Sequence, residues 1–188
     1  MVFGIGVLFF GTAQVVLPFI VRDVFDAGEN LARDIAIVNI FMMCGIVFTA
    51  MLIGRMGGIE RQGRALVLAL GFGAFVMASF GFVPTFWALS LATFAWGCGG
   101  GVAMTMNRTI IQESAPASHR GRILAVFQMG VLGGGPIGAL LSGFLIEWWG
   151  PQNAVLLPAA GMIAMLLLVC LVSPIWSLRS PLVSAAAD

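Results

Sequence analysis

Six apolar runs, each long enough to cross a membrane, determine what this chain can fold into. They cover residues 1–21, 35–54, 65–83, 86–107, 123–146 and 154–172. A helix needs about 20 apolar residues to cross roughly 30 Å of hydrocarbon, and each run is close to that length. Hydrophobic residues make up 60% of the 188 residues and charged residues only 9%, outside the usual range of soluble domains. The sequence therefore predicts an all-α membrane protein with six transmembrane helices.

Other fold classes do not fit these runs. A soluble α/β chain would place polar residues on one face of each element, at a period of about 3.6 or 2 residues, and the runs have neither pattern. A transmembrane β-barrel would need alternating segments of about 10 residues, which are also missing. We therefore expect one six-helix transmembrane domain at residues 1–176 and a cytoplasmic tail at residues 177–188.

The arginines predict the orientation, because basic residues accumulate in the cytoplasmic loops of membrane proteins. The chain has nine basic residues, all of them Arg. Those of the second loop, the fourth loop and the tail are Arg55, Arg61, Arg64, Arg108, Arg120, Arg122 and Arg179. Only Arg22 and Arg33 lie in the other loops. This asymmetry predicts that both termini are cytoplasmic.

Charged residues form a group on the predicted cytoplasmic side, which we call the cytoplasmic charge cluster. It consists of Arg55, Glu60, Arg61, Arg64, Arg108, Glu113, Arg120 and Arg122. Arg120 and Arg122 stand at the start of a predicted helix, where the helix dipole disfavours cations, so Glu113 is a candidate counter-charge. The cluster is either a simple topological anchor or also a latch that holds one conformation.

The stretch PASHRGRILAVFQMGVLGGGPIGALLSGFLIEWWGP, residues 116–151, resembles a known family. It is similar to the tenth-to-twelfth-helix region of the major facilitator superfamily, where a proline, Arg-Gly-Arg and a Gly-Pro-x-Gly helix recur. The branch it most resembles is that of drug and siderophore exporters related to the enterobactin exporter. LPFIVRDVF at residues 17–25 is similar to the end of the family's seventh helix. The resemblance implies that the chain is the C-terminal half of a twelve-helix transporter.

A loop signature of this family occurs in two imperfect copies. The signature is Gly, three residues, Asp, two residues, Gly and then a basic residue. The copy that begins at Gly54 lacks both the Asp and the second Gly, whereas Gly143, Glu147 and Gly150 keep the spacing with Glu in place of Asp. Because the two copies follow the second and fifth spans, they predict that the half is built from two inverted three-helix repeats.

Polar residues inside the spans are candidates for contact with a solute. In hydrocarbon such side chains face other helices or a water-filled cavity. The resemblance implies that the first and fourth spans line the central cavity. The cavity candidates on those spans are Thr12, Gln14, Trp96, Thr105 and Asn107. Hydrogen bonding between helices is the alternative role for Gln14 and Asn107.

Small residues recur at every fourth position of the fifth span, at Gly130, Gly134, Gly138 and Ser142. This spacing forms a smooth ridge that another helix can approach closely. The resemblance implies that this span contacts the other half, so we expect inter-half packing, with packing inside this half as the alternative. Pro136 removes a backbone hydrogen bond and is a candidate hinge.

The sequence also argues against several classes of function. No Asp, Glu, Lys, Arg or His lies near the middle of a span, so there is no evident membrane-embedded group for a coupling proton. The three cysteines lie in spans without metal-ligand spacing, and we expect neither metal nor cofactor. The spans contain no Ser–His pair for an intramembrane protease and no charged ring or filter of a channel. We therefore do not expect an enzyme.

The expected function is efflux of a small, amphipathic solute by alternating access, as half of a twelve-helix antiporter in the plasma (bacterial inner) membrane. The absence of fixed charge within the spans favours weakly polar solutes. The expected partners are the bilayer, the solute and a second six-helix half, either a missing N-terminal half or another copy of the chain, and no nucleic acid. The alternative is a non-transporting six-helix module, or a truncated fragment, that acts only by assembling with a partner.

Overall fold

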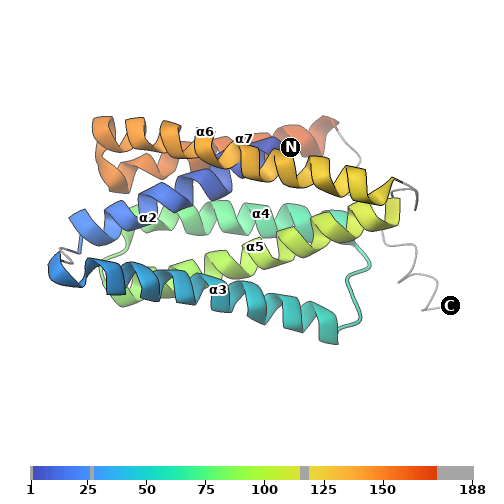
Figure 1. The fold of residues 1–188 in the computed structure, drawn as a ribbon, viewed down its shortest axis with the longest axis horizontal. Helices are drawn as coiled ribbons and strands as arrows, with labels where there is room; N and C mark the ends of the chain where they lie inside the picture. The colour runs from blue at the N-terminus through green and yellow to red at the C-terminus, as the bar shows by residue number, and fades with distance from the viewer. Residues whose placement is uncertain (1, 26–27, 115–118, 173–188) are drawn as a thin grey trace.

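The computed structural model describes residues 2–25, 28–114 and 119–172, and these ranges are predominantly helical (Figure 1). The first span combines three consecutive segments: α1 (Val2–Ile5), the π-helix η1 (Gly6–Gly11) and α2 (Thr12–Asp23). The later long helices are α3 (Leu31–Arg55), α4 (Gln62–Ser79), α5 (Phe86–Ser114), α6 (Arg120–Ala154) and α7 (Leu156–Val172). Two short 3-10 segments are η2 (Gly28–Asn30) and η3 (Phe80–Phe82). The tail at residues 177–188 lies outside the described residues.

Five helical segments of the described chain are long and apolar enough to cross a membrane. They are Gly6–Asp23, Gly28–Arg55, Gln62–Phe82, Phe86–Glu113 and Gly121–Ala154. The remaining apolar helix, α7, is shorter, with 17 described residues. The all-helical membrane fold therefore agrees with the prediction, and most helices extend beyond the apolar runs by a few residues because their polar ends continue the backbone hydrogen bonding.

The helices run side by side along the long axis of the molecule, and successive helices run in opposite directions (Figure 1). Helix α5 packs between α3 and α4, while α7 packs against α4 and the first span packs against α6. The C-terminal ends of α2, α4 and α6 and the N-terminal ends of α3, α5 and α7 lie at one end of the bundle (left in Figure 1). The C-terminal ends of α3 and α5 and the N-terminal ends of α4 and α6 lie at the opposite end.

Glycines allow α3 and α5 to pack with their backbones in contact. A Cβ atom on Gly45 of α3 would overlap the carbonyl oxygen of Phe94, and one on Gly97 of α5 would overlap that of Met42. A Cβ on Gly101 would lie 3.0 Å from the carbonyl oxygen of Ile46. In a bilayer, where lipid competes equally for apolar side chains, such close backbone packing is a main source of helix association.

The ridge on the fifth span packs inside this chain. Its members are Gly130, Gly134, Gly138 and Ser142. A Cβ on Gly138 would overlap the carbonyl oxygen of Val7 and lie 2.9 Å from the Cα of Gly11, while one on Gly6 would lie 3.1 Å from the carbonyl oxygen of Gly130. Close approach is thus found, but with the first span, whose own glycines face the ridge. The inter-half role assigned to the ridge is corrected to packing within the half.

Helix α6 continues through Pro136 and changes direction elsewhere. The only non-helical backbone angles inside α6 are those of Gly150, with φ 77° and ψ 162°. A positive φ costs little at glycine, and Pro151 follows with the fixed φ that suits the first position of a helix. The break therefore lies at the end of the fifth span, and the hinge role of Pro136 stays a prediction.

Candidate functional site

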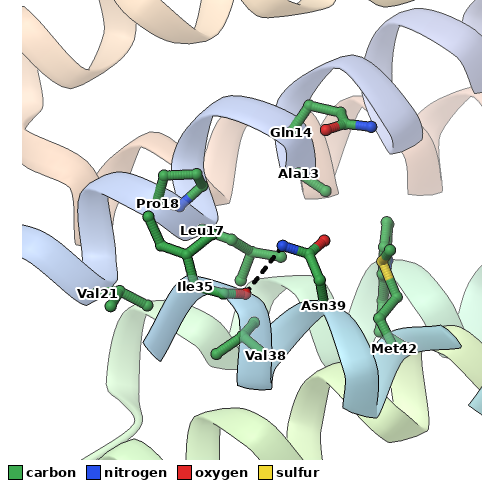
Figure 2. Close-up of a pocket in the computed structure, with 10 residues that line it drawn as sticks. Ala13, Gln14, Leu17, Pro18, Val21, Ile35, Val38, Asn39 and Met42 are labelled. Atoms are coloured by element: carbon green, nitrogen blue, oxygen red, sulfur yellow. Dashed lines mark hydrogen bonds between the residues drawn. The ribbon is translucent and has the colours of Figure 1, made fainter. Parts of the chain in front are cut away.

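A cavity of about 170 Å³, which we call the outer pocket, lies between α2, α3 and α5 (Figure 2). Its lining residues are Ala13, Gln14, Leu17, Pro18, Val21, Ile35, Val38, Asn39, Met42 and Trp96. None of these described lining residues is ionisable. The pocket lies toward the end of the bundle where α2 connects to α3, which the arginine distribution assigns to the external side.

Two carboxamides give the outer pocket its polar character. Gln14 lies on α2 and Asn39 lies on α3, so the two helices carry them on opposite sides of the pocket (Figure 2). The Nδ2 of Asn39 donates a hydrogen bond to the carbonyl oxygen of Ile35 at 2.9 Å. That bond uses one of the two N–H donors of Asn39, so the other N–H and the neutral acceptor Oδ1 remain for a ligand.

A second, smaller cavity of about 30 Å³ lies between η1, α4, α5 and α6, and we call it the inner pocket. It contains Asn107 and Gln128 among apolar residues of the four helices. The Nδ2 of Asn107 donates to the carbonyl oxygen of Ala103 at 2.9 Å, so this side chain also keeps its oxygen as an acceptor. Phe9 lines the inner pocket and Trp96 lines the outer pocket, and their rings stack with centroids 4.4 Å apart.

The five cavity candidates of the sequence do not share one cavity. Gln14 and Trp96 line the outer pocket and Asn107 lines the inner pocket. Thr105 lies on α5 and donates to the carbonyl oxygen of Gly101 at 2.8 Å. Thr12 is buried on the far side of its helix, in an apolar crevice of about 440 Å³ beside α6 and α7 that Ser142 also lines. The first span therefore places Gln14 and Thr12 on different faces.

Two polar residues of these pockets were missing from the sequence-based candidates. Asn39 belongs to the second span and Gln128 to the fifth. Both stand inside apolar runs, so the rule that polar residues in spans face helices or cavities would have selected them. They were missed because only the first and fourth spans were expected to line the cavity.

The helix ends that carry the cytoplasmic charge cluster lie together at one end of the bundle (Figure 1). Arg55 ends α3, Glu60 and Arg61 precede α4, and α5 ends shortly after Glu113. The Nε2 of Gln62, which is buried, lies 3.2 Å from each carboxylate oxygen of Glu113.

This bond joins the start of α4 to the end of α5, and sequence analysis did not single out Gln62. The positions of Arg64, Arg108 and Arg122 are at the same end, on α4, α5 and α6. The side chain of Arg120 lies outside the described residues.

Two ion pairs between sequence neighbours lie where α2 ends and α3 begins. The Nε of Arg22 lies 2.5 Å from the Oδ1 of Asp23, and that of Arg33 lies 3.0 Å from the Oδ1 of Asp34. The guanidinium of Arg22 also lies 4.4 Å from the ring centre of Phe19. These pairs neutralise the few arginines of this end locally, although exposed pairs of this kind contribute little to stability.

A bundle of apolar helices with long lipid-length segments and polar pockets between them defines an integral membrane protein. The family model described as Major Facilitator Superfamily matches residues 1–184. The chain therefore belongs to the major facilitator superfamily.

Curated relatives share part of their length with this chain. It is 32% identical over 123 residues to the multidrug resistance protein MdtG of Dickeya zeae (strain Ech586), which covers 64% of this chain and 28% of the relative. It is 28% identical over 144 residues to the multidrug resistance protein MdtG of Klebsiella pneumoniae (strain 342), and this match covers 74% of the chain and 33% of the relative. The match thus spans about a third or less of each relative. No solved structure matches the chain.

Proposed function

We propose that the chain is one half of an efflux transporter that moves a small amphipathic solute by alternating access, and that the outer pocket is part of its solute site. The outer pocket carries this proposal. It combines an apolar wall with two carboxamides, Gln14 and Asn39, and none of its described lining residues bears a charge. Such a site suits a weakly polar solute, since its apolar body is buried while its donor groups meet neutral acceptors.

The membership of the superfamily and the names of the two relatives support export as the direction of transport. Both relatives come from bacteria, which favours the bacterial inner membrane, and the arginine asymmetry favours cytoplasmic termini. We extend the proposal to antiport, to the C-terminal position of the half, to its origin in two inverted three-helix repeats, and to the exporter branch that includes the enterobactin exporter.

The proposed partner is a second six-helix half. The matched segments cover a third or less of each relative's length, and the outer pocket has an open side. A second half in the same membrane orientation would cover that side. We propose an N-terminal half as this partner and a second copy of the chain as the next candidate. A six-helix module that only assembles, without transport, is the second candidate function.

Export is tested with N-phenyl-1-naphthylamine, a neutral fluorescent amphiphile with one N–H donor. Efflux-deficient bacterial cells would produce the chain alone or together with the N-terminal half of a relative, and probe accumulation would be measured. We expect saturable export only when a second half is present. Saturable export by a demonstrated monomer would contradict the need for a partner, and absence of export with every partner would favour the assembly module.

Asn39→Leu tests the outer pocket as the solute site. Losing one hydrogen bond of about 0.5–1.5 kcal/mol should raise the probe concentration for half-maximal export by about 2–10-fold. Asn153→Leu is the matched control, because Asn153 is also exposed and makes the same kind of bond. Its Nδ2 donates to the carbonyl oxygen of Trp149, four residues earlier, at 3.1 Å. Equal effects of the two substitutions would argue against the outer pocket.

A further inference from the structure

A stacked aromatic pair contributes one ring to the outer pocket and one to the inner pocket. Phe9 lines the inner pocket and Trp96 lines the outer pocket. Their rings are stacked, with centroids 4.4 Å apart and planes inclined by 22°. Phe9 is 1% exposed and Trp96 is 2% exposed, so the pair is part of the packed interior. A molecule that passed from one pocket to the other along this line would have to part the two rings.

The ring of Phe9 occupies a notch formed by two glycines. A Cβ atom on Gly73 of α4 would lie 2.5 Å from the Cε2 of Phe9, closer than side chains pack. A Cβ on Gly100 of α5 would lie 3.6 Å from its Cε1, in ordinary contact. Trp96 is held from another direction by Phe80, whose ring meets it edge-on at 6.4 Å. Both rings of the stack are therefore seated by α4, α5 and η3.

The backbone that carries Phe9 is the π-helical segment η1, Gly6–Gly11. Such wide turns are rare and occur often at functional sites. Glycines at both ends of η1 meet α6: a Cβ on Gly6 would overlap the carbonyl oxygen of Val131, and one on Gly11 would lie 2.5 Å from that of Gly135. Because η1 is fixed on α6 and Phe9 is seated on α4 and α5, a shift of α6 relative to these helices would move Phe9 against Trp96.

We propose that the Phe9–Trp96 stack is the barrier that closes the solute site on its inner side and limits the length of the solute that the outer pocket accepts. This inference rests on the proposed function of the outer pocket. The stack supplies a flat aromatic floor for an amphipathic solute, and it separates when the first span and α5 move apart. Phe9 is thus a residue that determines solute length, and Trp96 is its counterpart on the outer side.

Cysteine labelling in intact cells tests the barrier without requiring transport. The three native cysteines are replaced by alanine, and Gln128→Cys introduces a thiol into the inner pocket. The charged, membrane-impermeant reagent MTSET is added from outside. With Phe9 in place labelling should be slow, and with Phe9→Ala it should be about 10-fold faster, because thiol reactivity follows exposure. Unchanged labelling would overturn the barrier.

Phe80→Ala is the matched control for this experiment. Phe80 is also buried, at 2% exposed, and also contacts Trp96, but it lines neither pocket. Because both rings of the Phe9–Trp96 stack remain in this variant, the labelling rate at Gln128→Cys should rise much less than it does with Phe9→Ala. An equal acceleration by Phe80→Ala would mean that loosened packing, rather than an opened barrier, exposes the inner pocket, and it would overturn the proposal.

Gly73→Ala keeps the proposal testable if Phe9→Ala fails to fold, because it adds one methyl group where the Phe9 ring lies. Its control is Gly71→Ala on the same helix, where a Cβ would find its nearest neighbour, the Cδ1 of Leu166, only at 4.0 Å. Gly73→Ala should speed the labelling several-fold and Gly71→Ala should not. Equal rates would count against the barrier.

Binding of N-alkylanilines of increasing chain length gives the second readout, followed by fluorescence of a variant that retains Trp96 alone among the tryptophans. Phe9→Ala should allow longer members of the series to bind, and an unchanged length limit would contradict the role of Phe9. Faster labelling without any export of N-phenyl-1-naphthylamine would refute the proposed function alone. Export with unchanged labelling and an unchanged length limit would refute the barrier alone.

Discussion

Gly138→Ala should destabilise the bundle more than Gly133→Ala on the same helix. A Cβ on Gly138 would overlap the carbonyl oxygen of Val7 and lie 2.9 Å from the Cα of Gly11. Both neighbours are backbone atoms, which cannot rotate away as a side chain would. The first span and α6 would have to separate until non-bonded atoms regain their ordinary distance of about 3.5–4.0 Å.

The expected size follows from comparing the two positions. Overpacking of this kind costs about 1–3 kcal/mol in well-packed interiors. Alanine also gains about 0.5–1 kcal/mol over glycine inside a helix, but this gain is common to both substitutions and cancels in the difference. Gly133 is exposed, and a Cβ there would meet nothing within 4 Å. The free energy of unfolding of Gly138→Ala should therefore fall below that of Gly133→Ala by about 1–3 kcal/mol.

The assay is reversible unfolding of the purified chain in mixed micelles with increasing SDS, followed by circular dichroism. The two variants are compared at the same detergent-to-protein ratio, since the micelle is the solvent of the helices. Gly138→Ala should unfold at a lower SDS fraction than both the parent and Gly133→Ala. If Gly138→Ala is as stable as Gly133→Ala, close packing of the first span on the ridge of α6 does not stabilise the bundle.

Three other predictions concern topology, the cytoplasmic end and the hinge. In a cysteine-free background, Asn30→Cys should react with an impermeant thiol reagent applied to intact cells and Met56→Cys should not; the reverse pattern would invert the orientation. Gln62→Leu should lower the free energy of unfolding by about 1–3 kcal/mol in the same SDS titration, because Glu113 loses a charge-assisted hydrogen bond, and an unchanged midpoint would show that the bond is unimportant. Pro136→Ala should slow export of N-phenyl-1-naphthylamine while leaving its binding unchanged. Unaltered export would contradict a hinge role for Pro136.

The glycine spacing shows where sequence information ends. The repeat of small residues on the fifth span predicted a close helix contact, and the contact exists. Its partner could not be read from the spacing, because a smooth ridge fits any helix with a complementary face. The tertiary structure decided it: Gly6 and Gly11 of the first span meet the ridge, so both helices contribute glycines to one interface.

The polar residues show the same division. Their presence in apolar runs marked Gln14 and Asn107 as facing a cavity or another helix, but the run alone gives no direction around the helix axis. The structure assigned Gln14 to the outer pocket, Asn107 to the inner pocket and Thr12 to an apolar crevice, and it added Asn39 from α3.

The sequence by itself determined that the chain lies in a lipid bilayer, that it is helical and which superfamily it resembles. These follow from run length and composition, because hydrocarbon forces each spanning segment to satisfy its backbone hydrogen bonds internally as a helix. Only the tertiary structure decided which helix faces meet. Phe9 and Trp96 lie in different spans, and their stacking is seen only in the tertiary structure. Helix packing depends on the shapes of both surfaces in contact. No single apolar run specifies the face that will pack against it.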